Sequence, residues 1–135
     1  MLEYYILPKM LGYVERAWVG DPDWSELTEE NEIKSNRLIA WNRFANQVGQ
    51  HELPRLESQW GGLKVRLPKP GLMQKDGMIY ANIQTPGLII RYTKDGSDPT
   101  VDSSVYTGLI PYQRGLKFSA FSPEGSQSGV SALED

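Results

Sequence analysis

Residues 95–98, Asp-Gly-Ser-Asp, are a short stretch whose types could do chemistry, because two carboxylates and a hydroxyl stand within four positions. Oxygen donors of this kind bind calcium. A helix-loop-helix calcium loop, however, needs acids at alternate positions, then a glycine and a distant glutamate, and this order is missing. Asp-Gly after an apolar run is typical of a turn, since glycine takes positive φ and aspartate tolerates it. We interpret these residues as a turn between strands, with calcium binding as the alternative.

Other catalytic chemistry has few candidates in this chain. There is no cysteine and only one histidine, His51, whose place beside Glu52 is typical of a capping or surface residue. The adjacent acids at 29–30 and 134–135 lie in an acidic connector and at a chain end, so neither is typical of a pair that hydrolyses sugars. The connector, residues 20–33, carries six acids and no base, and we interpret it as solvated, with a cation site as the alternative. We predict no catalytic residue, no metal site and no cofactor.

Aromatic rings are the remaining candidates, because their faces stack on sugar rings. Trp18 and Trp41 fall on apolar stripes and are expected to pack. Sugar-stacking candidates are instead found near element ends and in the strands: Trp24, Trp60, Tyr92 and Tyr106. Packing is the competing interpretation for each of them.

The first sixty residues have helical periodicity. One stripe predicts a helix over residues 7–18 with a face that needs a partner: Leu7, Met10, Leu11, Val14 and Trp18. Asp23 and Glu26 have capping-box spacing and predict a short helix over residues 24–30. A further stripe predicts a helix that opens at Ser35-Asn36 and closes at Gly49, and a last helical stripe follows to Trp60.

The period shortens after residue 61. Alternating or branched runs predict strands at residues 78–83, 88–93 and 116–121, and Gly and Pro separate them at the spacing of a β-sandwich. We predict an α+β fold with two domains. Residues 1–60 form a helical segment, and residues 61–135 form a small immunoglobulin-like antiparallel β-sandwich.

Charge and hydropathy exclude two classes of partner. The 14 basic and 17 acidic side chains give a net charge of -3, which lacks the basic footprint of a nucleic-acid-binding protein. No apolar run approaches the roughly 18 residues that a membrane span needs, and a signal-peptide pattern is absent. We therefore expect neither a nucleic-acid partner nor a membrane span.

Three stretches together resemble a known family. "LPKMLGYVERAW", residues 7–18, resembles the helix after the last barrel strand of family 20 glycoside hydrolases, the β-N-acetylhexosaminidases. "WNRFANQVGQHELPRLESQWGGLKVRLPKPG", residues 41–71, is similar to that family's closing helices. "IRYTKDGSDPT" and "SSVYTGLI" are similar to its immunoglobulin-like C-terminal module. The departures are Lys9, where the family prefers arginine, and a longer acidic stretch at residues 20–36.

The resemblance implies a non-catalytic C-terminal fragment of a β-N-acetylhexosaminidase, which removes terminal N-acetylhexosamine from glycans. The helices would be the end of a TIM barrel plus connector helices, and the partner would be the parent catalytic barrel. The family's catalytic Asp-Glu pair lies in a His-x-Gly-Gly-Asp-Glu motif that this sequence lacks. Whether the chain acts as an enzyme is left open; we expect the fragment alone to be inactive. The resemblance also implies a periplasmic or extracellular location.

Two alternatives belong to other classes of function. The chain could be a carbohydrate-binding or adhesion module that takes a glycan on its aromatic rings. It could also be a self-assembling interaction domain, with a homodimer formed through the helix face from Leu7 to Trp18.

Overall fold

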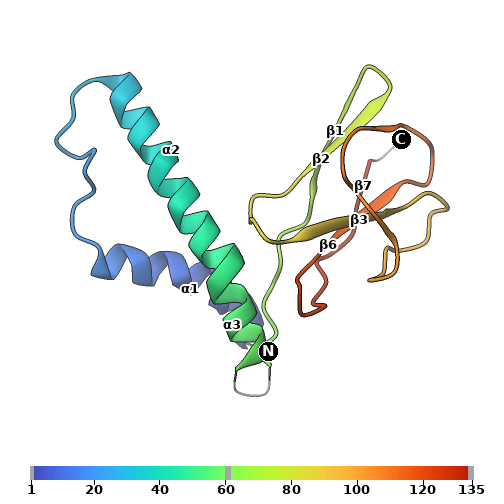
Figure 1. Ribbon diagram of the computed structural model, residues 1–135, viewed down its shortest axis with the longest axis horizontal. Helices are drawn as coiled ribbons and strands as arrows, with labels where there is room; N and C mark the ends of the chain where they lie inside the picture. The colour runs from blue at the N-terminus through green and yellow to red at the C-terminus, as the bar shows by residue number, and fades with distance from the viewer. Residues whose placement is uncertain (1, 60–61, 134–135) are drawn as a thin grey trace.

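The computed structural model describes residues 2–59 and 62–133. The helices come first. α1 spans Leu2–Trp18, α2 spans Glu30–Gln47, and the short π-helical turn η1 (Val48–Glu52) leads from α2 directly into α3 (Leu53–Ser58). Figure 1 shows α2, η1 and α3 as one continuous rod, with α1 crossing it near the α3 end. The helical character predicted for the first sixty residues is confirmed.

The start of α1 and the predicted short helix differ from the sequence-based expectation. α1 begins at Leu2 rather than near Leu7, because a proline removes one backbone hydrogen bond but does not stop the helix from continuing on both sides. Residues 24–29 do not form the predicted short helix, and Glu30 belongs to α2. The backbone makes isolated turns, such as Ser25 N–H to the Pro22 carbonyl (2.8 Å), and a single turn without an apolar face does not propagate.

The boundaries predicted for the second helix were also wrong. α2 begins at Glu30, five residues before the expected cap at Ser35. Glu30 and Glu32 lie in its first turn, where negative charge complements the partial positive charge of a helix N-terminus. Gly49 does not end the helical run, because η1 carries the chain on into α3.

The remainder of the chain forms two antiparallel sheets. One has three strands in the order β1 (Gly71–Lys75), β2 (Met78–Asn82) and β5 (Ile110–Pro111). The other has four strands in the order β4 (Ser104–Val105), β3 (Ile89–Thr93), β6 (Lys117–Phe121) and β7 (Ser131–Ala132). The strands predicted at residues 78–83, 88–93 and 116–121 are confirmed to within one residue at each end. The α+β class with an antiparallel sandwich is therefore confirmed.

β1 was not predicted. It pairs with β2 along its whole length, from Gly71 opposite Asn82 to Lys75 opposite Met78. The strands are joined by a two-residue turn in which Asp76 (φ 51°) and Gly77 (φ 72°) both take the left-handed conformation of a type I′ hairpin. The Asp-Gly pair was the signal that could have found this hairpin. Four of the five β1 residues are exposed, which weakens the alternation that marks a strand.

Two apolar cores hold the chain together. The first lies between the sheets and is built on four buried residues: Ile79, Ile90, Leu116 and Phe118. The second is centred on Leu53, Val65 and Leu67, each 3% exposed, and half-buried apolar residues from both parts of the chain pack on it: Leu7, Val48, Leu56 and Leu88. The second core thus combines α1, η1, α3, the segment that contains Val65 and Leu67, and the loop before β3.

None of the helices in the described part of the chain is long and apolar enough to cross a membrane.

Candidate functional site

The most distinctive surface of this molecule is apolar and lies on α1 and α2. Leu7 and Leu11 of the predicted α1 stripe are half-buried against the rest of the chain, whereas Met10, Val14 and Trp18 stay 44%, 46% and 84% exposed. Large exposed apolar side chains continue along α1 and onto α2: Ile6, Tyr13, Leu38, Ile39 and Trp41. We call the set of these eight residues the helix face. Three of its members, Met10, Val14 and Trp18, belong to the α1 stripe for which the sequence predicted a partner surface.

A groove of about 620 Å³ lies between α1 and α2. The two helices come near each other where Gly12 faces the ring of Phe44, since a Cβ at position 12 would lie 3.9 Å from that ring. The groove is lined by apolar side chains and by a rim of three cations and one acid: Arg16, Lys34, Arg37 and Glu15. The groove therefore fits an apolar partner surface that also carries carboxylates.

Two of the tryptophans line this groove. Trp24 is half-buried and lies in the turn between the helices, and Trp41 extends from α2, with its ring centroid 6.0 Å from that of Phe44. Trp60, another candidate sugar platform, lies outside the described residues. Of the predicted aromatic candidates that the structure describes, Trp24 lines a groove that a second tryptophan also lines.

The tyrosine candidates belong to the sandwich core. The ring of Tyr92 stacks on Phe118 with centroids 5.8 Å apart, and Tyr106 meets the same Phe118 edge-on at 6.0 Å. The Tyr106 hydroxyl donates to the carbonyl of Ile79 (3.2 Å) and accepts the N–H of Ala81 (3.0 Å). Tyr106 thereby links β2 to the segment after β4. Sugar stacking by either residue stays a prediction, since these contacts occupy at least one face or edge of each ring.

The Asp95–Asp98 stretch, which first suggested metal chemistry, is organised by contacts within the chain. The Asp95 carboxylate accepts the hydroxyl (2.6 Å) and the backbone N–H (3.0 Å) of Ser97. These bonds, the hydroxyl first, hold the pKa of Asp95 below its usual value of 3.8. Asp98 pairs with Lys117 at 2.7 Å. The stretch is a bend within the 94–103 connection from β3 to β4, so the turn interpretation is confirmed.

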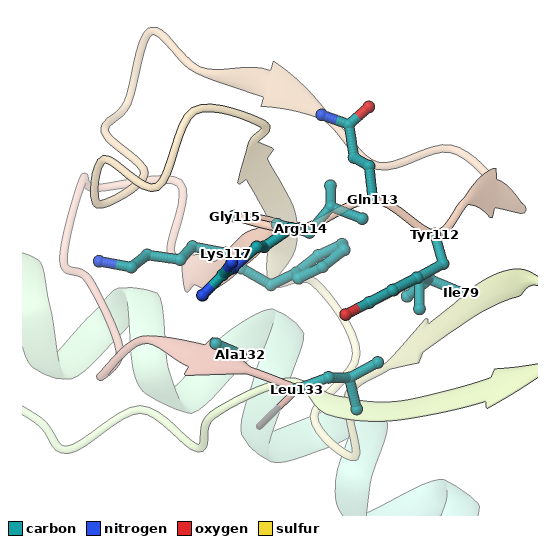
Figure 2. A pocket seen from close by; sticks show the side chains of 10 residues that line it. Ile79, Tyr112, Gln113, Arg114, Gly115, Lys117, Ala132 and Leu133 are labelled. Atoms are coloured by element: carbon teal, nitrogen blue, oxygen red, sulfur yellow. The ribbon is translucent and has the colours of Figure 1, made fainter. Parts of the chain in front are cut away.

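A second, smaller pocket of about 210 Å³ opens at one end of the sandwich. Figure 2 shows the Tyr112 hydroxyl turned toward Arg114 and Lys117, while Gln113 points away. Ile79, Phe118 and Leu133 supply the apolar wall. Among the residues that the structure describes, no carboxylate or histidine lines this pocket.

Acidic and histidine side chains do not converge elsewhere in the described residues. Across residues 2–59 and 62–133, no three of His, Cys, Asp and Glu gather as a metal site would require. His51 is exposed in η1, and the adjacent Glu29 and Glu30 are exposed at the start of α2.

Comparisons with known proteins relate the sandwich to glycoside hydrolases. Residues 68–132 match the family described as the chitobiase/beta-hexosaminidase C-terminal domain. The chain is 35% identical over 105 residues to the N,N'-diacetylchitobiase of Vibrio harveyi, an alignment that covers 71% of this chain and 12% of that protein. It is 28% identical over 112 residues to the beta-hexosaminidase of Vibrio vulnificus, with 70% and 13% covered. The chain therefore spans about an eighth of the length of these relatives.

Proposed function

Because this chain belongs, through residues 68–132, to the chitobiase/β-hexosaminidase C-terminal domain family, we propose that it is the non-catalytic C-terminal part of a β-N-acetylhexosaminidase. In this proposal α1 closes the outer wall of a TIM barrel, and α2 with α3 connects that barrel to the sandwich. Its role is structural support. The whole enzyme would remove terminal N-acetylhexosamine from glycans in the periplasm or outside the cell, a location that rests on the family resemblance alone.

The helix face is the observation that carries this proposal. A chain that works alone rarely leaves so many large apolar side chains of two neighbouring helices in water. The outer helices of a TIM barrel each bury one face against the barrel strands, which is the cover that Met10, Val14 and Trp18 lack here. The cations at the groove rim, Arg16 and Arg37 among them, would meet carboxylates on the barrel.

A matched pair of substitutions tests the docking. In a polypeptide that carries both the catalytic barrel and this chain, Val14→Lys would bury an unpaired charge and should cost about 3 kcal/mol of stability. Val101→Lys makes the same change at a site of similar exposure (51% against 46%) in the sandwich loop, and should cost little. Thermal unfolding and chromogenic N-acetylglucosaminide hydrolysis would be measured together. Equal melting temperatures and equal hydrolysis rates for the two variants would contradict the docking proposal.

The absence of catalysis in the chain alone is tested separately. The purified 135-residue chain should not hydrolyse a chromogenic N-acetylglucosaminide, because its described acids do not converge. Turnover that persists through rigorous purification, and at constant specific activity, would rule out the non-catalytic role.

Glycan binding in the groove is the second candidate function. The presence of Trp24, Trp41 and arginines in the lining of one groove favours it, because aromatic faces and charged hydrogen-bonding groups together recognise sugars. Chitooligosaccharide should then quench tryptophan fluorescence saturably, and Trp24→Ala should abolish the effect. Tryptophan fluorescence that does not change at millimolar sugar would exclude glycan binding, and docking to the barrel would remain the proposed role of the groove.

A further inference from the structure

We propose that the helices and the sandwich form one rigid, cooperatively unfolding unit, locked by direct main-chain contact between Gly49 and the loop at residues 85–87. Whatever holds α1 and α2 would then also set the orientation of the sandwich. The inference goes beyond the proposed function, since it concerns this chain by itself and holds whether or not the helix face meets a catalytic barrel.

The first step is the contact at Gly49. This glycine is buried in η1, and a Cβ added to it would lie 1.9 Å from the carbonyl oxygen of Pro86 and 2.9 Å from both the carbonyl carbon of Pro86 and Cγ2 of Thr85. The closest of these atoms are backbone atoms, which cannot swing aside as the end of a flexible side chain can. No side chain therefore separates the helical run from the loop between β2 and β3.

The contact is reciprocal at Gly87. This residue has a φ of +87°, in the left-handed region that disfavours side chains, and a Cβ there would lie 3.0 Å from the carbonyl oxygen of Gly49. Each glycine thus allows the close approach of the other's backbone. Two backbones that meet in this way have little freedom to slide or tilt relative to each other.

The local helix geometry changes at the same place. π-Helical turns are rare and costly, and they usually occur where the local geometry serves another purpose. The residue of η1 that is buried is Gly49. The distortion of the helical rod therefore coincides with its contact to the sandwich, as expected if that contact selects the wider turn.

Residues 62–70, which join the helices to the sandwich, are held at several points. Val65 and Leu67 are 3% exposed in the second core, and Leu88 packs on the same core from the sandwich side. Hydrogen bonds hold both ends: Leu63 N–H donates to the carbonyl of Leu56 (3.1 Å), and the Ser131 hydroxyl donates to the carbonyl of Pro70 (2.8 Å). A flexible linker would have exposed side chains and a solvated backbone instead.

The distribution of tryptophan allows the two parts to be followed separately. All four tryptophans precede residue 61, so their emission reports the helices, while amide NMR signals of β3 and β6 report the sandwich. In urea, the full 135-residue chain should lose both signals with the same midpoint. Residual dipolar couplings from α2 and β3 should fit a single alignment tensor.

Substitution of Gly49 should lower the urea midpoint, whereas substitution of glycines with open space around them should not. Gly49→Ala should lower the tryptophan-reported midpoint by about 1 M urea, given an overpacking cost of 1–3 kcal/mol and a similar dependence on urea. Gly20→Ala and Gly108→Ala are the controls, one in each part, because a Cβ at either meets nothing within 4 Å and neither has a left-handed φ. Both should retain the wild-type midpoint.

Two outcomes would overturn the proposal. One is an unchanged midpoint in Gly49→Ala. The other needs no variant and holds even if Gly49→Ala does not fold: separate unfolding transitions, or two alignment tensors, in the wild-type chain. Neither result bears on docking to a barrel, so a failure of this inference is distinguishable from a failure of the proposed function.

Discussion

The Asp95 carboxylate accepts two hydrogen bonds from Ser97, and the Tyr106 hydroxyl takes part in two hydrogen bonds with β2. Both side chains were candidates for function by residue type. Polar groups in turns and between sheets are needed to satisfy backbone donors and acceptors, so a suggestive residue type often has a structural role. Two carboxylates, Asp95 and Glu57, affect the stability of the chain in opposite ways, and both effects can be measured.

The first residue-scale prediction concerns pH. The pKa of the Asp95 carboxyl is lower in the folded chain than its ordinary value of 3.8. Such a carboxyl stabilises the folded chain at pH values above 3.8, and this stabilisation is lost as the pH falls through the pKa of the folded chain. Asp95→Asn should therefore unfold at slightly lower urea than wild type near neutral pH, and the difference should narrow below pH 3.8. Ser97→Ala should show the same trend. A difference that does not change with pH would contradict the assignment.

The second residue-scale prediction concerns Glu57 in α3. Both of its carboxylate oxygens are buried and neither has a hydrogen-bond partner within the described residues. Buried acceptor oxygens without a partner cost stability, and an amide can donate as well as accept, so Glu57→Gln should raise the free energy of unfolding by about 1 kcal/mol. Glu52→Gln is the control, because that carboxylate accepts a bond from Gln47 (3.0 Å) and lies 4.0 Å from Arg55. Urea denaturation that shows no gain for Glu57→Gln would count against this account.

At the element scale, short elements are held by their turns and by pairing across the sheets. β1 has a weak apolar pattern but is aligned with β2 over five residue pairs by a turn with two left-handed residues. α1 shows the opposite case. Its periodicity is strong, yet within the described residues only part of the stripe is covered, since Met10 and Val14 stay 44% and 46% exposed.

The element-scale prediction tests the β1–β2 turn. Gly77→Ala places a Cβ on a residue with φ 72°, which costs roughly 1–2 kcal/mol in the left-handed region. Thermal unfolding should show a clearly lower Tm for this variant. Gly108→Ala, at a glycine without a left-handed φ, should leave Tm nearly unchanged. Equal Tm values for the two variants would mean that the turn geometry is not stabilising.

At the scale of the whole molecule, the two parts of the chain differ in how complete they are. The sandwich encloses its own core, with Ile79 and Phe118 at 0% and 1% exposure. The helices leave Tyr13 and Trp18 at 73% and 84% exposure. The division into domains at residues 60 and 61 stays a prediction, and the Gly49 contact argues that the parts move together.

The whole-molecule prediction concerns the fate of the helix face when the chain is alone. An uncovered apolar patch binds hydrophobic dyes or pairs with a second copy. Wild type should therefore bind such a dye or scatter light as a dimer, and the double substitution Met10→Lys with Val14→Lys should weaken whichever is observed. A monomer that binds no dye would show that the face needs no cover.

Much of the architecture was determined by the sequence itself. Alternation in β2, β3 and β6, helical spacing in α1 and α2, and Asp-Gly turns are properties of neighbouring residues, so local physics is enough to predict them. The resemblance to glycoside hydrolases likewise depended on the order of short motifs, and the match at residues 68–132 agrees with it.

Only the tertiary structure decided which residues of a pattern are covered and which are exposed. Leu7 and Val14 belong to one stripe by spacing, yet only Leu7 reaches the second core. Gly49 was expected to end a helix, and instead it admits the backbone of Pro86. Both outcomes depend on segments that are distant in sequence, and local periodicity contains no information about which distant backbone will approach.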